Sequence, residues 1–136
     1  MYGWNCPFER QNIVTASLAK LKNNETVSAY EDVYSNPLYS QSCAAAIWKI
    51  VSENKTGAFN IAGRDRVNVF ELIRKAATIF GYDDSAIVSV KQGFFKELVK
   101  MPRYTSLSKT KMVKDLLLTP LSIMEGLSFM KESYKE

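Results

Sequence analysis

Arg103 is the residue of this sequence best suited to bind a phosphate group. It lies between Pro102 and Tyr104 in an expected loop, so its side chain neighbours an aromatic ring. A guanidinium group presents a planar fork of N–H donors that matches phosphate oxygens. The sequence therefore predicts a site for a phosphate-bearing ligand at Arg103, whereas the nearby lysines individually favour a solvated face. Those lysines are Lys91, Lys96, Lys100, Lys109, Lys111 and Lys114.

Aromatic residues with polar tips gather in the first 39 positions, in expected loops or at strand ends. Loops commonly carry binding residues, and Tyr and Trp offer a flat apolar face suited to sugars and bases. Ordinary packing at helix ends explains the same residues equally well, so both interpretations stay open. The residues are Tyr2, Trp4, Tyr30, Tyr34 and Tyr39.

Several classes of chemistry are excluded by what the 136 residues do not contain. Histidine is absent, which excludes His-based metal sites and His-dependent triads. Neither Gly-x-Gly-x-x-Gly nor Gly-x-x-x-x-Gly-Lys-[Ser/Thr] occurs, and no tyrosine is followed four positions later by lysine. Glu31 and Asp32 are acid/base candidates, but an exposed pair is the favoured interpretation. The sequence thus predicts no catalytic residue and no metal site within these residues.

Residues 57–72 give the clearest structural pattern of the sequence. Residues 58–62 are short, mostly apolar and flanked by glycine, which predicts a buried strand. After a polar turn, Asn68 and Glu71 form a capping-box pattern, and the apolar spacing that follows predicts a helix up to Gly81.

The remaining elements are expected to be mostly helical, with about three short strands in total. So few strands are too small a set for a self-sufficient sheet, which predicts that part of the sheet comes from another segment, another subunit or a partner chain. The helix after residue 40 has the apolar face Cys43, Ala44, Ile47, Trp48 and Val51, and the final helix has the stripe Ile123, Leu127, Met130 and Tyr134. Helices are expected over 8–22, from 40 or 42 to 51, over 92–100, over 108–117 and from the Thr119–Pro120 pair onward, strands over 26–30 and 87–90, and an extended segment over 104–107.

Length and composition indicate one domain with a sizeable core. The chain has 136 residues, of which 46% are hydrophobic and 24% charged, with a net charge of +4. That charge permits an anionic ligand, but nucleic-acid binding would need a denser basic stripe. Cys6 and Cys43 fit free thiols in a reducing compartment. No apolar run approaches a membrane span of roughly 20 residues, and no secretory signal is present, so a cytoplasmic protein without membrane partners is expected.

Four segments resemble one family in their order and spacing. They are Tyr-Gly-Trp-Asn at 2–5, Glu-Asp-Val-Tyr-Ser-Asn-Pro at 31–37, Gly-Ala-Phe-Asn-Ile-Ala-Gly at 57–63 with Val-Asn-Val-Phe-Glu-Leu at 67–72, and Pro-Arg-Tyr-Thr-Ser-Leu-Ser-Lys-Thr-Lys at 102–111. The set resembles the C-terminal half of extended short-chain dehydrogenase/reductases. Within them it is most similar to the dTDP-4-dehydrorhamnose reductase group, which includes the regulatory β subunit of methionine adenosyltransferase.

The resemblance implies an α/β fold that is mostly helical with a few short strands. It makes residues 1–136 a single substrate-binding domain, the C-terminal portion of a Rossmann-type enzyme without the N-terminal dinucleotide-binding βαβ units. Glu31 and Asp32 replace the family's Asp-Gln pair, and Met101 replaces the arginine that precedes its proline. The implied cofactor-binding residues are Tyr2 and Gly3, and the implied substrate-binding residues are Tyr2, Trp4, Asn5, Asn36, Pro37, Arg103 and Tyr104.

Two functions follow from the resemblance. The first is the substrate-binding portion of an NADPH-dependent reductase of a dTDP-4-keto-6-deoxyhexose, which is not catalytic alone and binds NADP or NAD only when a Rossmann half completes it. The second is a non-enzymatic regulatory or interaction module, like the methionine adenosyltransferase β subunit. In that case an exposed sheet edge and an uncovered apolar face would bind a partner chain or a second copy.

Overall fold

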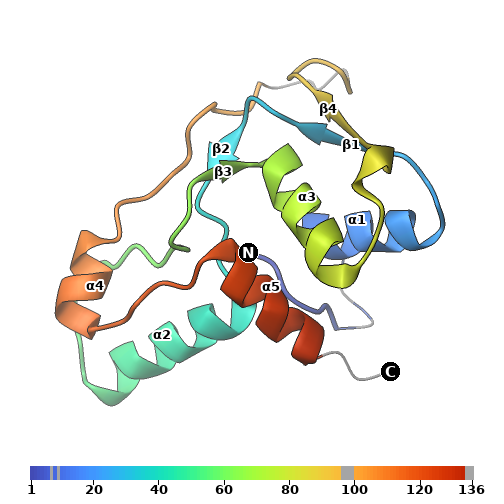
Figure 1. Ribbon diagram of the computed structural model, residues 1–136. Coiled ribbons are helices and arrows are strands. Elements are labelled where there is room, and N and C mark those ends of the chain that lie inside the picture. The colour runs from blue at the N-terminus through green and yellow to red at the C-terminus, as the bar shows by residue number, and fades with distance from the viewer. Residues whose placement is uncertain (7, 9, 96–99, 134–136) are drawn as a thin grey trace.

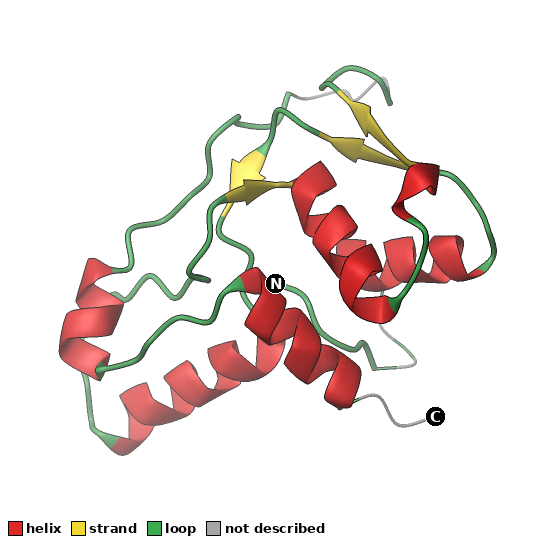
Figure 2. Cartoon of the chain, in the orientation of Figure 1, coloured by secondary structure: helices red, strands yellow, loops and turns green. Residues whose placement is uncertain are grey.

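The computed structural model describes residues 1–6, 8, 10–95 and 100–133. In these residues the chain is mostly helical with short strands, which confirms the predicted α/β class (Figures 1 and 2). The helices are α1 (Ile13–Lys22), α2 (Ser40–Ser52), α3 (Val69–Phe80), α4 (Thr110–Leu116) and α5 (Ile123–Glu132), with a 3-10 turn η1 (Asp84–Ala86). The strands are β1 (Val27–Tyr30), β2 (Tyr34–Ser35), β3 (Val67–Asn68) and β4 (Ile87–Val90).

The strands form two small sheets. β1 and β4 pair in parallel, with Val27 opposite Ile87, and β2 pairs antiparallel with β3, with Tyr34 opposite Asn68. On its other side β2 meets residues 103–105, because the Tyr34 N–H donates to the Arg103 carbonyl at 2.7 Å. Three segments that are distant in sequence therefore lie side by side around Tyr34.

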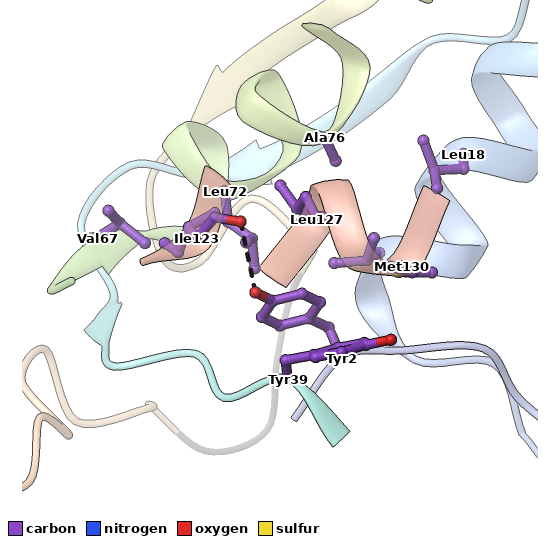
Figure 3. Packing of buried hydrophobic residues seen from close by; sticks show 10 residues of the cluster. Tyr2, Leu18, Tyr39, Val67, Leu72, Ala76, Ile123, Leu127 and Met130 are labelled. Carbon is purple, nitrogen blue, oxygen red and sulfur yellow. Dashed lines mark hydrogen bonds between the residues drawn. The ribbon is translucent and has the colours of Figure 1, made fainter. Parts of the chain in front are cut away.

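Helix α3 is the central element and packs against α1, α5, β1 and β4. Its predicted start and end are confirmed. The Asn68 side chain accepts the Glu71 N–H at 2.7 Å, the Glu71 carboxylate accepts the Asn68 N–H at 3.3 Å, and Gly81 ends the helix at φ 80°. One buried cluster lies where α3 meets α1 and α5 (Figure 3), and a second lies between α3 and the β1–β4 pair.

The strand predicted over residues 58–62 is wrong. The segment has no strand partner among the described residues, and of its five positions only Ala62 is buried. A lysine side chain binds its first residue instead, since Lys111 Nζ donates to the Ala58 carbonyl at 2.8 Å, and just beyond the segment Lys109 Nζ donates to the Arg64 carbonyl at 2.7 Å. The apolar run indicates a strand only where a neighbouring strand is present to pair with it.

Two helix starts differ from the prediction because a different residue provides the cap. Helix α1 begins at Ile13, since the Asn12 side chain accepts the Val14 N–H at 3.0 Å. Helix α5 begins at Ile123 rather than after the Thr119–Pro120 pair, since Ser122 and Glu125 form a capping box. The strands over 26–30 and 87–90 are confirmed as β1 and β4. The helix expected over 92–100 includes 96–99, and these residues and Tyr134 lie outside the described residues.

Most of the apolar face of α2 is exposed in the described structure. Ile47 is 55% exposed, Trp48 73% and Val51 63%, and Ala46 is the buried residue of this helix. In Figure 1, α2 lies beside α4, away from α1 and α3. The sequence predicted this face correctly as apolar, but the fold does not bury it.

Replacing Asn68 by alanine is expected to destabilise the fold by about 1–2 kcal/mol. The substitution removes the α3 cap, and it removes the bond from Asn68 Nδ2 to the Glu31 carbonyl at 3.0 Å. Urea denaturation followed by circular dichroism measures the loss. Asn60→Ala, at an exposed asparagine, is the matched control and should change little. Equal stabilities of the two variants would show that the cap contributes nothing.

Candidate functional site

A groove of about 580 Å³ lies between the start of α3 and the aromatic rings of β2 and the 103–105 segment. We call it the Tyr34–Tyr104 groove. Three separate segments build it, because the pairing around β2 brings the residues before α3 and those after Pro102 together. Its lining residues are Glu31, Asp32, Tyr34, Asn68, Phe70, Glu71, Arg74, Arg103 and Tyr104.

The Tyr34 and Tyr104 rings form a pair with a guanidinium group over it. Their centroids lie 5.7 Å apart at an interplanar angle of 31°. Arg66 Cζ lies 4.6 Å from the Tyr104 centroid and 5.3 Å from the Tyr34 centroid. Tyr34 is opposite Asn68, and Arg66 lies two positions before Asn68, so alternation along the strand directs Arg66 to the face that carries Tyr34.

Sequence reasoning missed the role of Arg66. The segment 63–66 was expected only to be a polar turn, and Tyr34 was only one of several aromatics. The signal that would have found the stack is the strand register, which sets a cation on one strand diagonally across from an aromatic on the next. That register depends on a pairing 34 residues apart in sequence, between Tyr34 and Asn68.

Most carboxylates of the groove already have partners within the chain. The Asp32 carboxylate accepts the Gln92 N–H at 3.1 Å, and the Glu71 carboxylate accepts the Asn68 N–H. Arg74 Nε donates to Asp84 at 2.8 Å. The arginine ion pairs found among the described residues involve Arg64 and Arg74 and include neither Arg66 nor Arg103.

The structure brings Arg103 and Tyr104 together in this groove and places Asn36 behind it. Asn36 Oδ1 accepts the Leu107 N–H at 2.8 Å, and its Nδ2 donates to the Asp65 carbonyl at 3.5 Å. Asn36 thus ties β2 to the segment that carries Arg103. Pro37 follows directly and is half-buried.

Trp4 and Asn5 lie elsewhere, in a second cleft of about 440 Å³ beside α1. Trp4 Nε1 donates to the Met130 carbonyl at 2.7 Å, and the Trp4 and Phe80 rings are nearly perpendicular, with centroids 5.8 Å apart. Asn5 Oδ1 accepts from Thr15 Oγ1 at 2.7 Å. These polar groups hold the N-terminal segment on α1 and α5. Trp4 and Asn5 therefore lie apart from Arg103 and Tyr104.

Tyr2 and Gly3 are part of the core. The Tyr2 side chain is 2% exposed, and its hydroxyl donates to the Ile123 carbonyl at 3.5 Å (Figure 3). Burial raises the pKa of the Tyr2 hydroxyl well above its ordinary value, and Tyr39 and Asp65 raise it further. Gly3 is buried, and its carbonyl accepts Asn12 Nδ2 at 2.8 Å. Their role beside a cofactor stays a prediction.

The described residues offer neither a metal site nor a membrane-spanning helix. No group of three or more His, Cys, Asp or Glu residues within the described ranges is arranged to hold a metal ion. In the same ranges, no helix combines the length and the apolar character that a bilayer crossing requires.

The comparison with known proteins gives one family. The family model described as RmlD substrate binding domain matches residues 2–135. No curated protein sequence matches the chain.

Three solved structures of similar fold are described as a dTDP-4-dehydrorhamnose reductase, a hypothetical one and a dTDP-glucose 4,6-dehydratase. The dTDP-4-dehydrorhamnose reductase of Bacillus anthracis str. Ames, solved with NADP, superposes with a TM-score of 0.85 at 18% identity, over 93% of this chain and 44% of that chain. A hypothetical dTDP-4-dehydrorhamnose reductase from Sulfolobus tokodaii gives 0.72 at 25% identity, over 88% and 42%. The dTDP-glucose 4,6-dehydratase of Bacillus anthracis str. Ames, solved with NAD, gives 0.74 at 16% identity, over 96% and 40%. The chain thus spans less than half the length of these structures.

Proposed function

The chain belongs to the RmlD substrate binding domain family, since that family's model matches residues 2–135, and from this membership we propose that it binds the nucleotide-sugar substrate of an NADPH-dependent reductase. The proposed substrate is a dTDP-4-keto-6-deoxyhexose. NADPH would supply the hydride for the 4-keto group once a dinucleotide-binding half is present. The family match over nearly the whole sequence is the observation that carries this proposal.

The residues of this chain bind and orient the substrate in the proposed function. Arg103 would contact the diphosphate, because it is exposed in the Tyr34–Tyr104 groove and forms no ion pair among the described residues. Tyr104, 64% exposed, would pack against the ligand. Asn36 and Pro37 would hold the loop behind them. Trp4 and Asn5 remain candidates for the sugar end.

The catalytic groups would come from a dinucleotide-binding half. The 136 residues contain neither the Gly-rich fingerprint nor Tyr-x-x-x-Lys. The exposed apolar residues of α2 support a docking surface for such a half, because exposed apolar faces are typical of contacts with other chains or domains. Under this proposal the chain alone transfers no hydride.

Isothermal titration calorimetry of the chain with dTDP tests the proposal. We expect dTDP to bind and NADPH to give no heat without the other half. Arg103→Ala should weaken dTDP binding about tenfold, because a charge-assisted contact to phosphate is lost. Lys20→Ala, at an exposed lysine of α1, is the control and should leave the affinity unchanged. No heat with dTDP would contradict the proposal.

The exposed face of α2 also favours a second candidate, a non-enzymatic interaction module. In that case Ile47, Trp48 and Val51 would bind a partner chain or a second copy. Sedimentation velocity separates the two candidates. The module is supported if the chain self-associates, if Trp48→Ser abolishes this self-association, and if the chain binds no nucleotide. The reductase is supported if the chain is a monomer that binds dTDP.

The cytoplasmic location stays a prediction.

A further inference from the structure

Arg66 lies against two aromatic rings, Tyr34 and Tyr104, that line the Tyr34–Tyr104 groove. Its guanidinium lies over Tyr104 and Tyr34, at 4.6 and 5.3 Å from the ring centroids. A flexible arginine normally loses side-chain entropy when it binds a ligand, and a stacked one has already lost much of it. The stack therefore prepares this side chain for a contact before any ligand arrives.

The N–H donors of the Arg66 guanidinium are the groups that would bind an anion. Contact with a ring uses the face of the guanidinium plane, while the N–H donors lie at its edge. Arg66 is exposed, and within the described ranges no carboxylate forms an ion pair with it. The adjacent acidic residue, Asp65, is engaged elsewhere, because its Oδ2 accepts the Ile123 N–H at 2.9 Å.

The residue before Tyr104 is a second arginine without an ion pair in the described structure. Arg103 directly precedes Tyr104, and it lines the groove that Tyr34 and Tyr104 also line. Arg66 lies over the Tyr104 ring and Arg103 lines the groove beside it, so an anion bound at Tyr104 would be attracted by both positive charges. Phosphate suits them well, since a guanidinium edge can bind two of its oxygens at once.

From these observations we propose that Arg66, fixed by Tyr34 and Tyr104, is a phosphate-binding residue that acts together with Arg103. The ligand class is a diphosphate ester. The proposal deepens the nucleotide-sugar function proposed above and rests on it for the choice of dTDP as a probe. It adds a residue from the turn before α3 to a site otherwise assigned to the segment after Pro102.

Calorimetric titration of the full chain with dTDP and with inorganic pyrophosphate tests the proposal. Arg66→Ala should weaken both ligands about tenfold, and Arg66→Lys should restore only part of the loss, because it keeps the charge but not the planar fork. Tyr104→Leu should weaken the binding of both ligands a few-fold, because the cation–π contact with Arg66 is lost. Tyr104→Phe keeps the ring and should not weaken binding. Arg10→Ala, at an exposed arginine of the N-terminal loop, is the matched control. Circular dichroism melting verifies that each variant is folded.

The outcomes separate this inference from the proposed function. If dTDP binds wild type and Arg66→Ala equally, the role of Arg66 is wrong and the nucleotide-sugar function stands. If pyrophosphate binding depends on Arg66 but dTDP does not bind, the phosphate site stands and the dTDP-sugar assignment is wrong. If Arg66→Lys binds both ligands as tightly as wild type, the charge alone matters, and the proposed role of the planar guanidinium is wrong. If neither ligand binds the wild-type chain, both proposals are overturned.

Discussion

Replacing Leu127 by alanine is expected to lower the free energy of unfolding by about 3–4 kcal/mol. Leu127 is fully buried in the cluster where α5 meets α3 and α1 (Figure 3). The substitution removes apolar contacts and leaves a cavity, because the helices packed around Leu127 relax only in part. Chemical denaturation with urea, followed by circular dichroism, gives the difference in stability.

Leu117→Ala is the control for this prediction. Leu117 is 81% exposed at the end of α4. Its backbone is left-handed (φ 51°), a conformation that is about equally unfavourable for leucine and alanine, so the substitution does not change this strain. The free energy of unfolding of Leu117→Ala should fall by less than about 0.5 kcal/mol. If the two alanine variants unfold at the same urea concentration, α5 does not form the core contacts described here.

Replacing Gly63 by alanine is expected to cost about 2–3 kcal/mol and to disturb the groove. An added Cβ would lie 1.9 Å from the Pro37 carbonyl oxygen. The contact is with backbone, so no side-chain rotation relieves it. The next residue is also fixed, because the Arg64 N–H donates to the Leu121 carbonyl at 2.9 Å. Denaturation measures the loss, and dTDP titration tests whether the displaced Asn36–Pro37 loop weakens the ligand.

Gly81→Ala separates this steric effect from the general cost of replacing glycine. Gly81 has φ 80°, and nothing lies within 4 Å of an added Cβ. Only the left-handed backbone strain applies, which costs about 1–2 kcal/mol. The affinity for dTDP should be unchanged in Gly81→Ala. A Gly63→Ala variant as stable as Gly81→Ala, with normal affinity, would mean that the Pro37 loop moves freely.

Local patterns predicted the helices well and the sheet poorly. The Asn68–Glu71 box and Gly81 fixed the bounds of α3, because capping involves neighbours within a few residues. Residues 58–62 were misjudged, since a strand needs a partner and that partner is not defined by local sequence. The apolar face of α2 was identified, but whether it is covered depends on contacts outside the helix.

The candidate site was predictable only in part for the same reason. Arg103 and Tyr104 stood out because a planar cation adjoins an aromatic ring in sequence, and the structure places both in the Tyr34–Tyr104 groove. Arg66 did not stand out, because its position over the rings depends on the β2–β3 register. The burial of the Tyr2 ring, which is 2% exposed, was not indicated by any local pattern, and its role beside a ligand stays a prediction.

The contact between residues 2–4 and α5 also affects the order in which the chain folds during its synthesis. The Tyr2 hydroxyl reaches Ile123 across 121 positions, and the Trp4 indole reaches Met130 across 126. A ribosome adds about 5–20 residues per second, so on the order of ten seconds separate the synthesis of Tyr2 and Trp4 from that of their partners on α5. During that interval both aromatic rings lack these partners and are available to chaperones. Closing so long a loop makes docking of the N-terminal segment on α5 a late folding event.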